Sequence, residues 1–199
     1  HSPGPRRIRF SPIPMLNVVL LGAPSAGKTT LAEHLAAEYD TLWMPEYGRA
    51  YWDAHQVDRR LTLEQLVEIA EGHLEREEAL LARAHGILFT DTNALTTRLF
   101  SLYYHDAVHP RLEALANQAE RRYDVVLVCD IDIPYDDTWD RSGDVQRNDF
   151  QAQVLADLEA RRIAYHLVRG DLETRVRQVS AILANEQPSA FSTRRGSVS

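Results

Sequence analysis

Cysteine and lysine occur only once each in this chain of 199 residues, as Cys129 and Lys28. A single cysteine excludes an internal disulfide and favours a reducing compartment, which we expect to be the cytoplasm. No apolar run approaches the ~20 residues that a membrane-spanning helix needs, so we expect no membrane association. The first residues contain Pro and Arg but no apolar stretch of the kind found in a secretory signal.

Acidic side chains are missing from both ends of the chain. Residues 1–14 and 187–199 carry five arginines and no acid, and both segments are rich in Pro or Ser. We interpret these segments as disordered tails or cloning remnants and expect the folded domain to span residues 15–186. The net charge is −7, so this middle part is strongly acidic, which argues against binding to nucleic acid.

The only lysine lies in Gly22-Ala23-Pro24-Ser25-Ala26-Gly27-Lys28-Thr29, which matches the phosphate-loop (Walker A) pattern G-x-x-x-x-G-K-[ST]. Glycines let successive backbone N–H groups turn toward an anion, and the following helix adds its positive N-terminal end. The compact ammonium reaches between the β- and γ-phosphates, where a forked guanidinium is bulkier and differently aimed. The Thr29 hydroxyl is the expected ligand of Mg²⁺. The residues predicted to bind a nucleoside triphosphate are Gly22, Pro24, Ser25, Ala26, Gly27, Lys28, Thr29 and Thr30.

Apolar runs alternate with helical patterns along the rest of the chain. Strands are expected at residues 16–21, 41–45, 86–91, 124–129 and 164–168. Helices are expected at residues 29–39, 62–84, 110–122 and 150–162, between Asp91 and Tyr104, and from Asp171 onward. Continuous apolar strands that alternate with helices predict an α/β fold, in which a five-stranded parallel sheet is covered on both faces.

Ligands of such sheets gather at the carboxyl ends of the strands. Asp91 closes one strand, where a carboxylate can hold Mg²⁺ directly or through water, or merely cap the next helix. Asp130 closes another strand in the same way, so position alone does not choose between them. Glu46 follows the second strand and can accept a hydroxyl proton or bind sugar hydroxyls, unless it pairs structurally with Arg49.

A long polar stretch at residues 136–147 is typical of a functional lid. Its Arg141 and Arg147 are predicted to close over the phosphates and neutralise charge during transfer. The alternative is a solvated loop whose arginines pair with neighbouring aspartates. Aromatic side chains lie on or near the same segments, and one or two of them are expected to stack on a planar or cationic acceptor. They are Tyr47, Tyr51, Trp52, Tyr103, Tyr104, Tyr135 and Trp139.

Two classes of phosphate-loop protein are excluded because the sequence lacks the residues that they require. A GTPase reads guanine with a loop that needs a second lysine, and a transporter ATPase carries an L-S-G-G-Q segment, which this chain lacks. A small phosphotransferase remains.

Four segments together resemble the kinase domain of the NadR-type nicotinamide-riboside kinases, from about residue 16 to residue 184. They are the phosphate loop, Glu46-Tyr47-Gly48-Arg49-x-Tyr51, Thr90-Asp91-Thr92-x-x-x-Thr96-Thr97, and Trp139-Asp140-x-x-x-Asp144-x-x-Arg147-x-x-Phe150. The resemblance implies an adenylate-kinase-like P-loop fold with a mobile lid. It also implies ATP- and Mg²⁺-dependent phosphorylation of the ribose 5′-hydroxyl of nicotinamide riboside. One departure is that Arg141 directly follows Asp140, where the family has D-G-x-R.

By this resemblance, each site residue receives an expected role. Thr29 and Asp91 hold Mg²⁺, and either Glu46 or Asp91 deprotonates the acceptor hydroxyl. The catalytic set is Lys28, Glu46, Asp91, Arg141 and Arg147, and the substrate-binding set is Glu46, Tyr47, Arg49, Asp91, Thr92, Tyr104 and Trp139. The remaining alternatives are a kinase of another small hydroxyl acceptor and a nucleotide-dependent regulatory ATPase.

Replacing Lys28 tests the phosphate-loop assignment. We expect Lys28→Ala to lose almost all turnover while the protein stays folded, because no other residue supplies a lysine to the loop. The measurement is ADP formation, with circular dichroism as the check on folding. Substantial residual activity in the folded variant would contradict the assignment.

Overall fold

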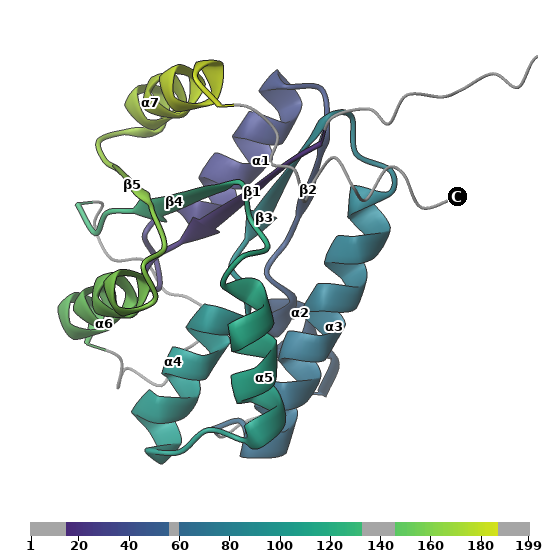
Figure 1. The fold of residues 1–199 in the computed structure, drawn as a ribbon, viewed down its shortest axis with the longest axis vertical. Coiled ribbons are helices and arrows are strands. Elements are labelled where there is room, and N and C mark those ends of the chain that lie inside the picture. The colour runs from purple at the N-terminus through teal and green to yellow at the C-terminus, as the bar shows by residue number, and fades with distance from the viewer. Residues whose placement is uncertain (1–14, 56–59, 133–145, 187–199) are drawn as a thin grey trace, which may run out of the picture.

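A computed structural model describes residues 15–55, 60–132 and 146–186. Within them five parallel strands form one sheet in the order β2-β3-β1-β4-β5 (Figure 1). The strands are β1 (Leu16–Leu21), β2 (Leu42–Met44), β3 (Ile87–Asp91), β4 (Val125–Cys129) and β5 (His166–Val168). The predicted α/β class with a five-stranded parallel sheet is confirmed. The predicted tails, residues 1–14 and 187–199, lie outside the described residues.

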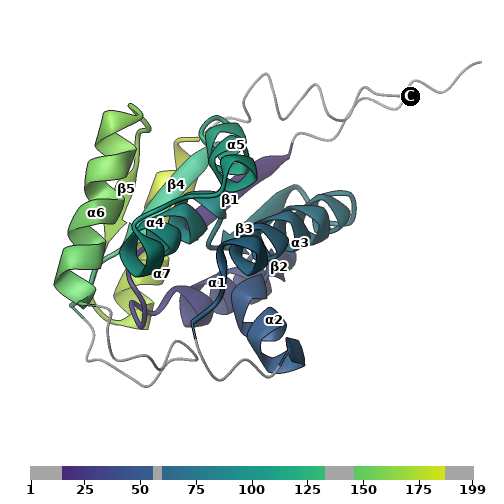
Figure 2. The same cartoon turned by 90° about the horizontal axis from the view of Figure 1, so that it is seen from below.

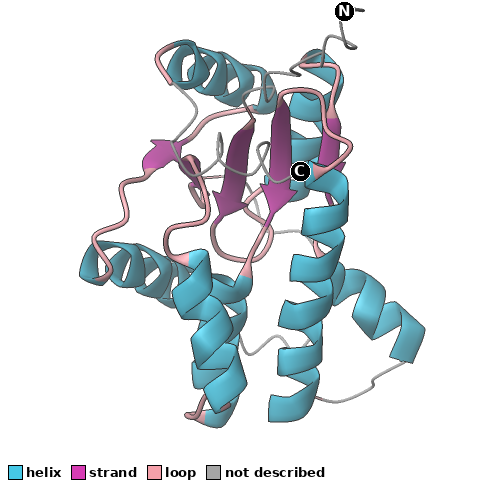
Figure 3. Ribbon diagram, turned by 45° about the vertical axis from the view of Figure 1, so that its right-hand side comes forward, coloured by secondary structure: helices cyan, strands magenta, loops and turns pink. Residues whose placement is uncertain are grey.

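Helices connect the strands throughout this part of the chain (Figure 3). They are α1 (Lys28–Glu38), α2 (Tyr47–His55), α3 (Leu63–Leu81), α4 (Ala94–His105), α5 (Pro110–Ala119), α6 (Arg147–Ala160) and α7 (Leu172–Ala184). None of these helices is long and apolar enough to cross a bilayer.

Two of these helices correct the sequence-based expectations. Helix α2 was not predicted, and it forms because Tyr47 and Tyr51, one turn apart, pack against α3 and its neighbours. Helix α6 begins at Arg147 rather than at Phe150. Arg147 therefore belongs to a helix and not to the polar loop in which it was predicted.

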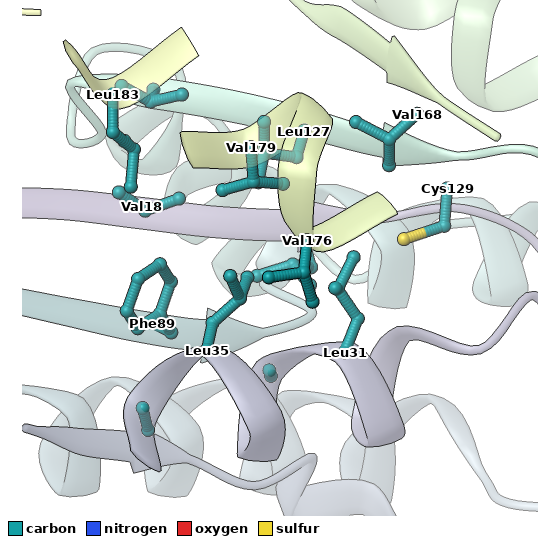
Figure 4. Close-up of a cluster of buried hydrophobic side chains, with 14 of the residues drawn as sticks. Val18, Leu31, Leu35, Phe89, Leu127, Cys129, Val168, Val176, Val179 and Leu183 are labelled. Atoms are coloured by element: carbon teal, nitrogen blue, oxygen red, sulfur yellow. The ribbon is translucent and has the colours of Figure 1, made fainter. Parts of the chain in front are cut away.

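The alternation of side chains along β1 explains why both faces of the sheet are covered. Val18 and Leu20 point to one face, where they join a cluster with residues of α1 and α7. Val19 and Leu21 point to the other face and join residues of α4, α5 and α6. Figure 2 shows the sheet between these two groups of helices, and Figure 4 shows the cluster around Val18. Two-sided burial makes β1 the centre of the molecule.

The start of α3 is fixed by a reciprocal cap. The Thr62 side chain accepts a hydrogen bond from the Gln65 backbone, and the Gln65 side chain accepts one from the Thr62 backbone. The pair forms a capping box, and Thr62 is the residue at which the sequence predicts this helix to start.

Substitution of Thr62 measures what this cap contributes. We expect Thr62→Ala to lower the free energy of unfolding by about 1 kcal/mol, because the Gln65 N–H loses its acceptor. Thr62→Ser keeps the oxygen and should stay close to the unchanged protein. Urea denaturation provides the measurement, and equal losses in the two variants would show that the cap oxygen is not the cause.

Candidate active site

The phosphate loop joins the end of β1 to the start of α1. Gly22, Ser25 and Gly27 have positive φ angles of 143°, 58° and 83°, and such residues turn neighbouring N–H groups toward a common centre. Gly22 is also tightly confined, because an added Cβ would lie 2.8 Å from the Cys129 carbonyl oxygen. The loop therefore has the strained, glycine-dependent backbone that anion binding requires.

Lys28 is held against its own loop. Its ammonium donates hydrogen bonds to the carbonyl oxygens of Gly22 (3.1 Å) and Ala23 (2.8 Å), and only 9% of the residue is exposed. The charge thus lies at the loop, where an incoming phosphate can accept from it. Pro24, Ala26 and Thr30 occupy the same loop and the first turn of α1, as predicted.

Asp91 and Thr29 meet directly. The Thr29 hydroxyl donates to a carboxylate oxygen of Asp91 at 2.6 Å, and the Thr92 hydroxyl donates to the other oxygen at 3.1 Å. Asp91 is completely buried at the end of β3. Its carboxylate is therefore aligned with the phosphate loop and not used as the cap of α4, which is supplied by Asn93.

Asp130 lies at the end of β4, much as Asp91 lies at the end of β3, but its carboxylate has other partners. Its carboxylate forms an ion pair of 2.5 Å with Arg169 and accepts a hydrogen bond from the Ile131 N–H. The geometry thus separates two carboxylates that strand position alone left equivalent, because only Asp91 contacts the loop hydroxyl among the described contacts.

Gln151, on α6, hydrogen-bonds to the phosphate loop. Its role was not predicted from the sequence. Gln151 accepts from the Ala23 N–H at 2.8 Å and donates to the Cys129 carbonyl at 3.1 Å. One side chain therefore ties the phosphate loop to the end of β4. Its only sequence signal is that it directly follows Phe150, on the apolar face of a predicted helix.

Arg175, on α7, is a second residue that sequence reasoning missed. It is 1% exposed and donates to the backbone carbonyls of Ala26, Asp130 and Gly170. It also pairs with Asp132 at 2.7 Å. Burial would raise the pKa of Asp132, but hydrogen bonds from Gly170 and Arg175 lower it below its usual range. The signal that was overlooked is an arginine beside the apolar stripe of the last helix.

Three predicted acceptor residues lie around the start of α2. Glu46 is half-buried just before this helix. The Tyr47 ring packs against α3, where Gly72 leaves room for it and the Arg76 guanidinium lies 3.9 Å from the ring centre. Arg49 is exposed and pairs with Asp53 at 3.3 Å. Their substrate roles stay predictions.

The remaining predicted residues come from α4, α6 and the lid stretch. Tyr104 packs on Phe100 and has the Arg60 guanidinium 5.2 Å from its ring centre. Arg147 donates to the Ile131 carbonyl at 3.0 Å, which holds it beside the segment after β4. Trp139 and Arg141 lie outside the described residues, as does the lid stretch before Gln146.

A family model and a curated protein each match most of this chain. Residues 17–175 match the family described as an AAA domain. The trifunctional NAD biosynthesis/regulator protein NadR of Escherichia coli strain K12 is 31% identical over 152 residues, or 74% of this chain. The match covers 37% of that protein, so the chain spans a little over a third of this curated relative.

Solved structures share the fold. A crystal structure of NadR protein in complex with NR aligns with a TM-score of 0.72 at 22% identity, covering 88% of this chain and 51% of that one. A crystal structure of NadR protein in complex with NAD and AMP-PNP aligns with a TM-score of 0.67 at 24% identity, covering 85% and 49%. At these identities the likeness concerns the fold.

A matched pair of variants tests which carboxylate acts at the loop. We expect Asp91→Asn to reduce turnover of ATP by at least about 100-fold, because it removes the charge beside Thr29. Asp130→Asn should stay within about threefold, because that carboxylate is already paired with Arg169. The assay is ADP formation, with thermal melting to confirm that both variants fold. Equal losses would refute the distinction.

Proposed function

This chain belongs to the AAA domain family, as a P-loop domain of the NadR type, and we propose that it is an ATP-dependent kinase of nicotinamide riboside. The proposed reaction transfers the γ-phosphoryl group of ATP to the ribose 5′-hydroxyl and yields nicotinamide mononucleotide, a step of NAD synthesis. Support comes from the NadR relative and from the NadR structures with NR and with an ATP analogue.

The observation that carries the proposal is the contact between Thr29 and Asp91. A hydroxyl and a carboxylate 2.6 Å apart, at the junction of the phosphate loop and β3, form an oxygen donor pair of the type that Mg²⁺ prefers. These two residues fit the ion and would hold it. When bound, Mg²⁺ neutralises charge on the phosphate oxygens.

Different residues of the chain have separate roles in the in-line transfer of the phosphoryl group. The backbone amides of the loop and Lys28 bind the β- and γ-phosphates. Glu46 or Asp91 orients the 5′-hydroxyl and takes its proton as the new P–O bond forms and the bond to ADP breaks. Arg147, together with Arg141 of the lid stretch, offsets the charge that develops during transfer.

The charge of the chain favours this acceptor. The pyridinium of nicotinamide riboside is a cation, and the chain carries 29 acidic side chains against 22 Lys and Arg. A surplus of negative charge attracts a cationic substrate and raises its rate of encounter. The face of Tyr104, which the sequence predicts to bind substrate, would hold the ring by stacking.

The decisive experiment follows ADP formation from Mg-ATP with and without nicotinamide riboside, and identifies the product by mass. We expect ADP formation to depend on the acceptor, with one mononucleotide formed per ADP. ADP formation without acceptor dependence would support a regulatory ATPase instead. Acceptor dependence that appears only with another nucleoside would retain the kinase but reject the proposed substrate.

A further inference from the structure

Helix α6 is attached to the end of β4 by two of its side chains. Arg147, its first residue, donates to the Ile131 carbonyl at 3.0 Å, and Gln151 donates to the Cys129 carbonyl at 3.1 Å. Arg147 and Gln151 are four residues apart, which places them on the same face of the helix. Their acceptors are two residues apart where β4 ends. The two bonds therefore hold the first turn of α6 against one short segment of backbone.

Gln151 extends this attachment to the phosphate loop. Its amide oxygen accepts from the Ala23 N–H at 2.8 Å, and only 5% of the residue is exposed. The Cys129 carbonyl that Gln151 binds also lies against the first glycine of the loop, because a Cβ added at Gly22 would lie 2.8 Å from that oxygen. The phosphate loop, the end of β4 and α6 thus meet at one buried amide group.

Other contacts hold the same turn of α6 on α4. The fully buried Phe150 ring lies 4.5 Å from the Phe100 ring, measured between centroids. The Gln146 N–H, just before the helix, donates to the Tyr103 hydroxyl at 3.2 Å. Neither contact involves the phosphate loop, whereas Gln151 bonds to it directly. The position of α6 relative to the loop therefore depends on Gln151.

We propose that Gln151 is a positioning residue that sets the distance between the phosphate loop and the Arg147 guanidinium. The inference rests on the proposed function, in which Arg147 offsets the charge that develops on the transferred phosphoryl group. The amide oxygen and nitrogen of Gln151 are both engaged with backbone groups, so Gln151 acts through Arg147 and not on the nucleotide. Its loss should therefore reduce the alignment needed in the transition state more than the binding of ATP.

A matched pair of variants on α6 tests this role. Gln151→Met keeps the length of the side chain but makes neither bond, and Gln153→Met is the control, because Gln153 is exposed on the same helix. We expect Gln151→Met to lower kcat at least about tenfold and to leave KM for ATP within about threefold. Gln153→Met should stay within about twofold in both. The assay is ADP formation with nicotinamide riboside, and an unchanged kcat in folded Gln151→Met would overturn the proposal.

Combination with Arg147→Ala separates positioning from general damage to the site. Without the guanidinium, Gln151 has nothing to position, so Gln151→Met added to Arg147→Ala should lower kcat by less than about threefold further. A further loss as large as that of Gln151→Met alone would refute the coupling. If thermal melting shows that Gln151→Met does not fold, the same cycle is measured with Gln151→Glu. This variant keeps the acceptor for the Ala23 N–H but loses the donor to the Cys129 carbonyl.

The unchanged protein separates this inference from the choice of acceptor. If ADP forms only with another nucleoside, nicotinamide riboside is the wrong substrate, and the same comparison of kcat with that nucleoside still tests Gln151. If no acceptor supports ADP formation, the kinase proposal and the role of Gln151 are both rejected.

Discussion

The pairing of β1 with β3 is the constraint on which the candidate site depends. Its register places Leu20 beside Asp91, and the Thr92 N–H donates to the Leu20 carbonyl at 2.9 Å. Because β1 runs directly into the phosphate loop, this register brings the Asp91 carboxylate to the loop hydroxyl. A shift by one residue would turn the carboxylate to the other face of the sheet.

Buried polar side chains add to the constraints that the sheet places on the phosphate loop. The loop backbone has positive φ angles that carry a cost in free energy, and it persists because neighbouring elements determine it. Gln151 holds Ala23 from α6, and Arg175 holds Ala26 from α7, each by bonds to main-chain atoms. Helices on opposite faces of the sheet thus both hydrogen-bond to the phosphate loop. The site is therefore preorganised before any ligand binds.

Much of this architecture could be predicted from local sequence patterns. The loop motif and the strand runs depend on neighbouring residues, and the five observed strands lie within the predicted ranges. Helix α2 was missed because its aromatic residues have modest helix propensity and are stabilised by α3. The first turn of α6 was missed because its polar residues resemble a loop, although Arg147 there reaches the Ile131 carbonyl.

By itself the sequence determined the parallel α/β class and the position of the single lysine in a phosphate loop, because apolar periodicity and loop chemistry are local properties. Only the tertiary structure decided that Asp91 contacts Thr29 while Asp130 pairs with Arg169. The same holds for Gln151 and Arg175, whose loop partners lie 128 and 149 residues away along the chain. Contacts at such separations are set by sheet register and helix packing, which no local pattern encodes.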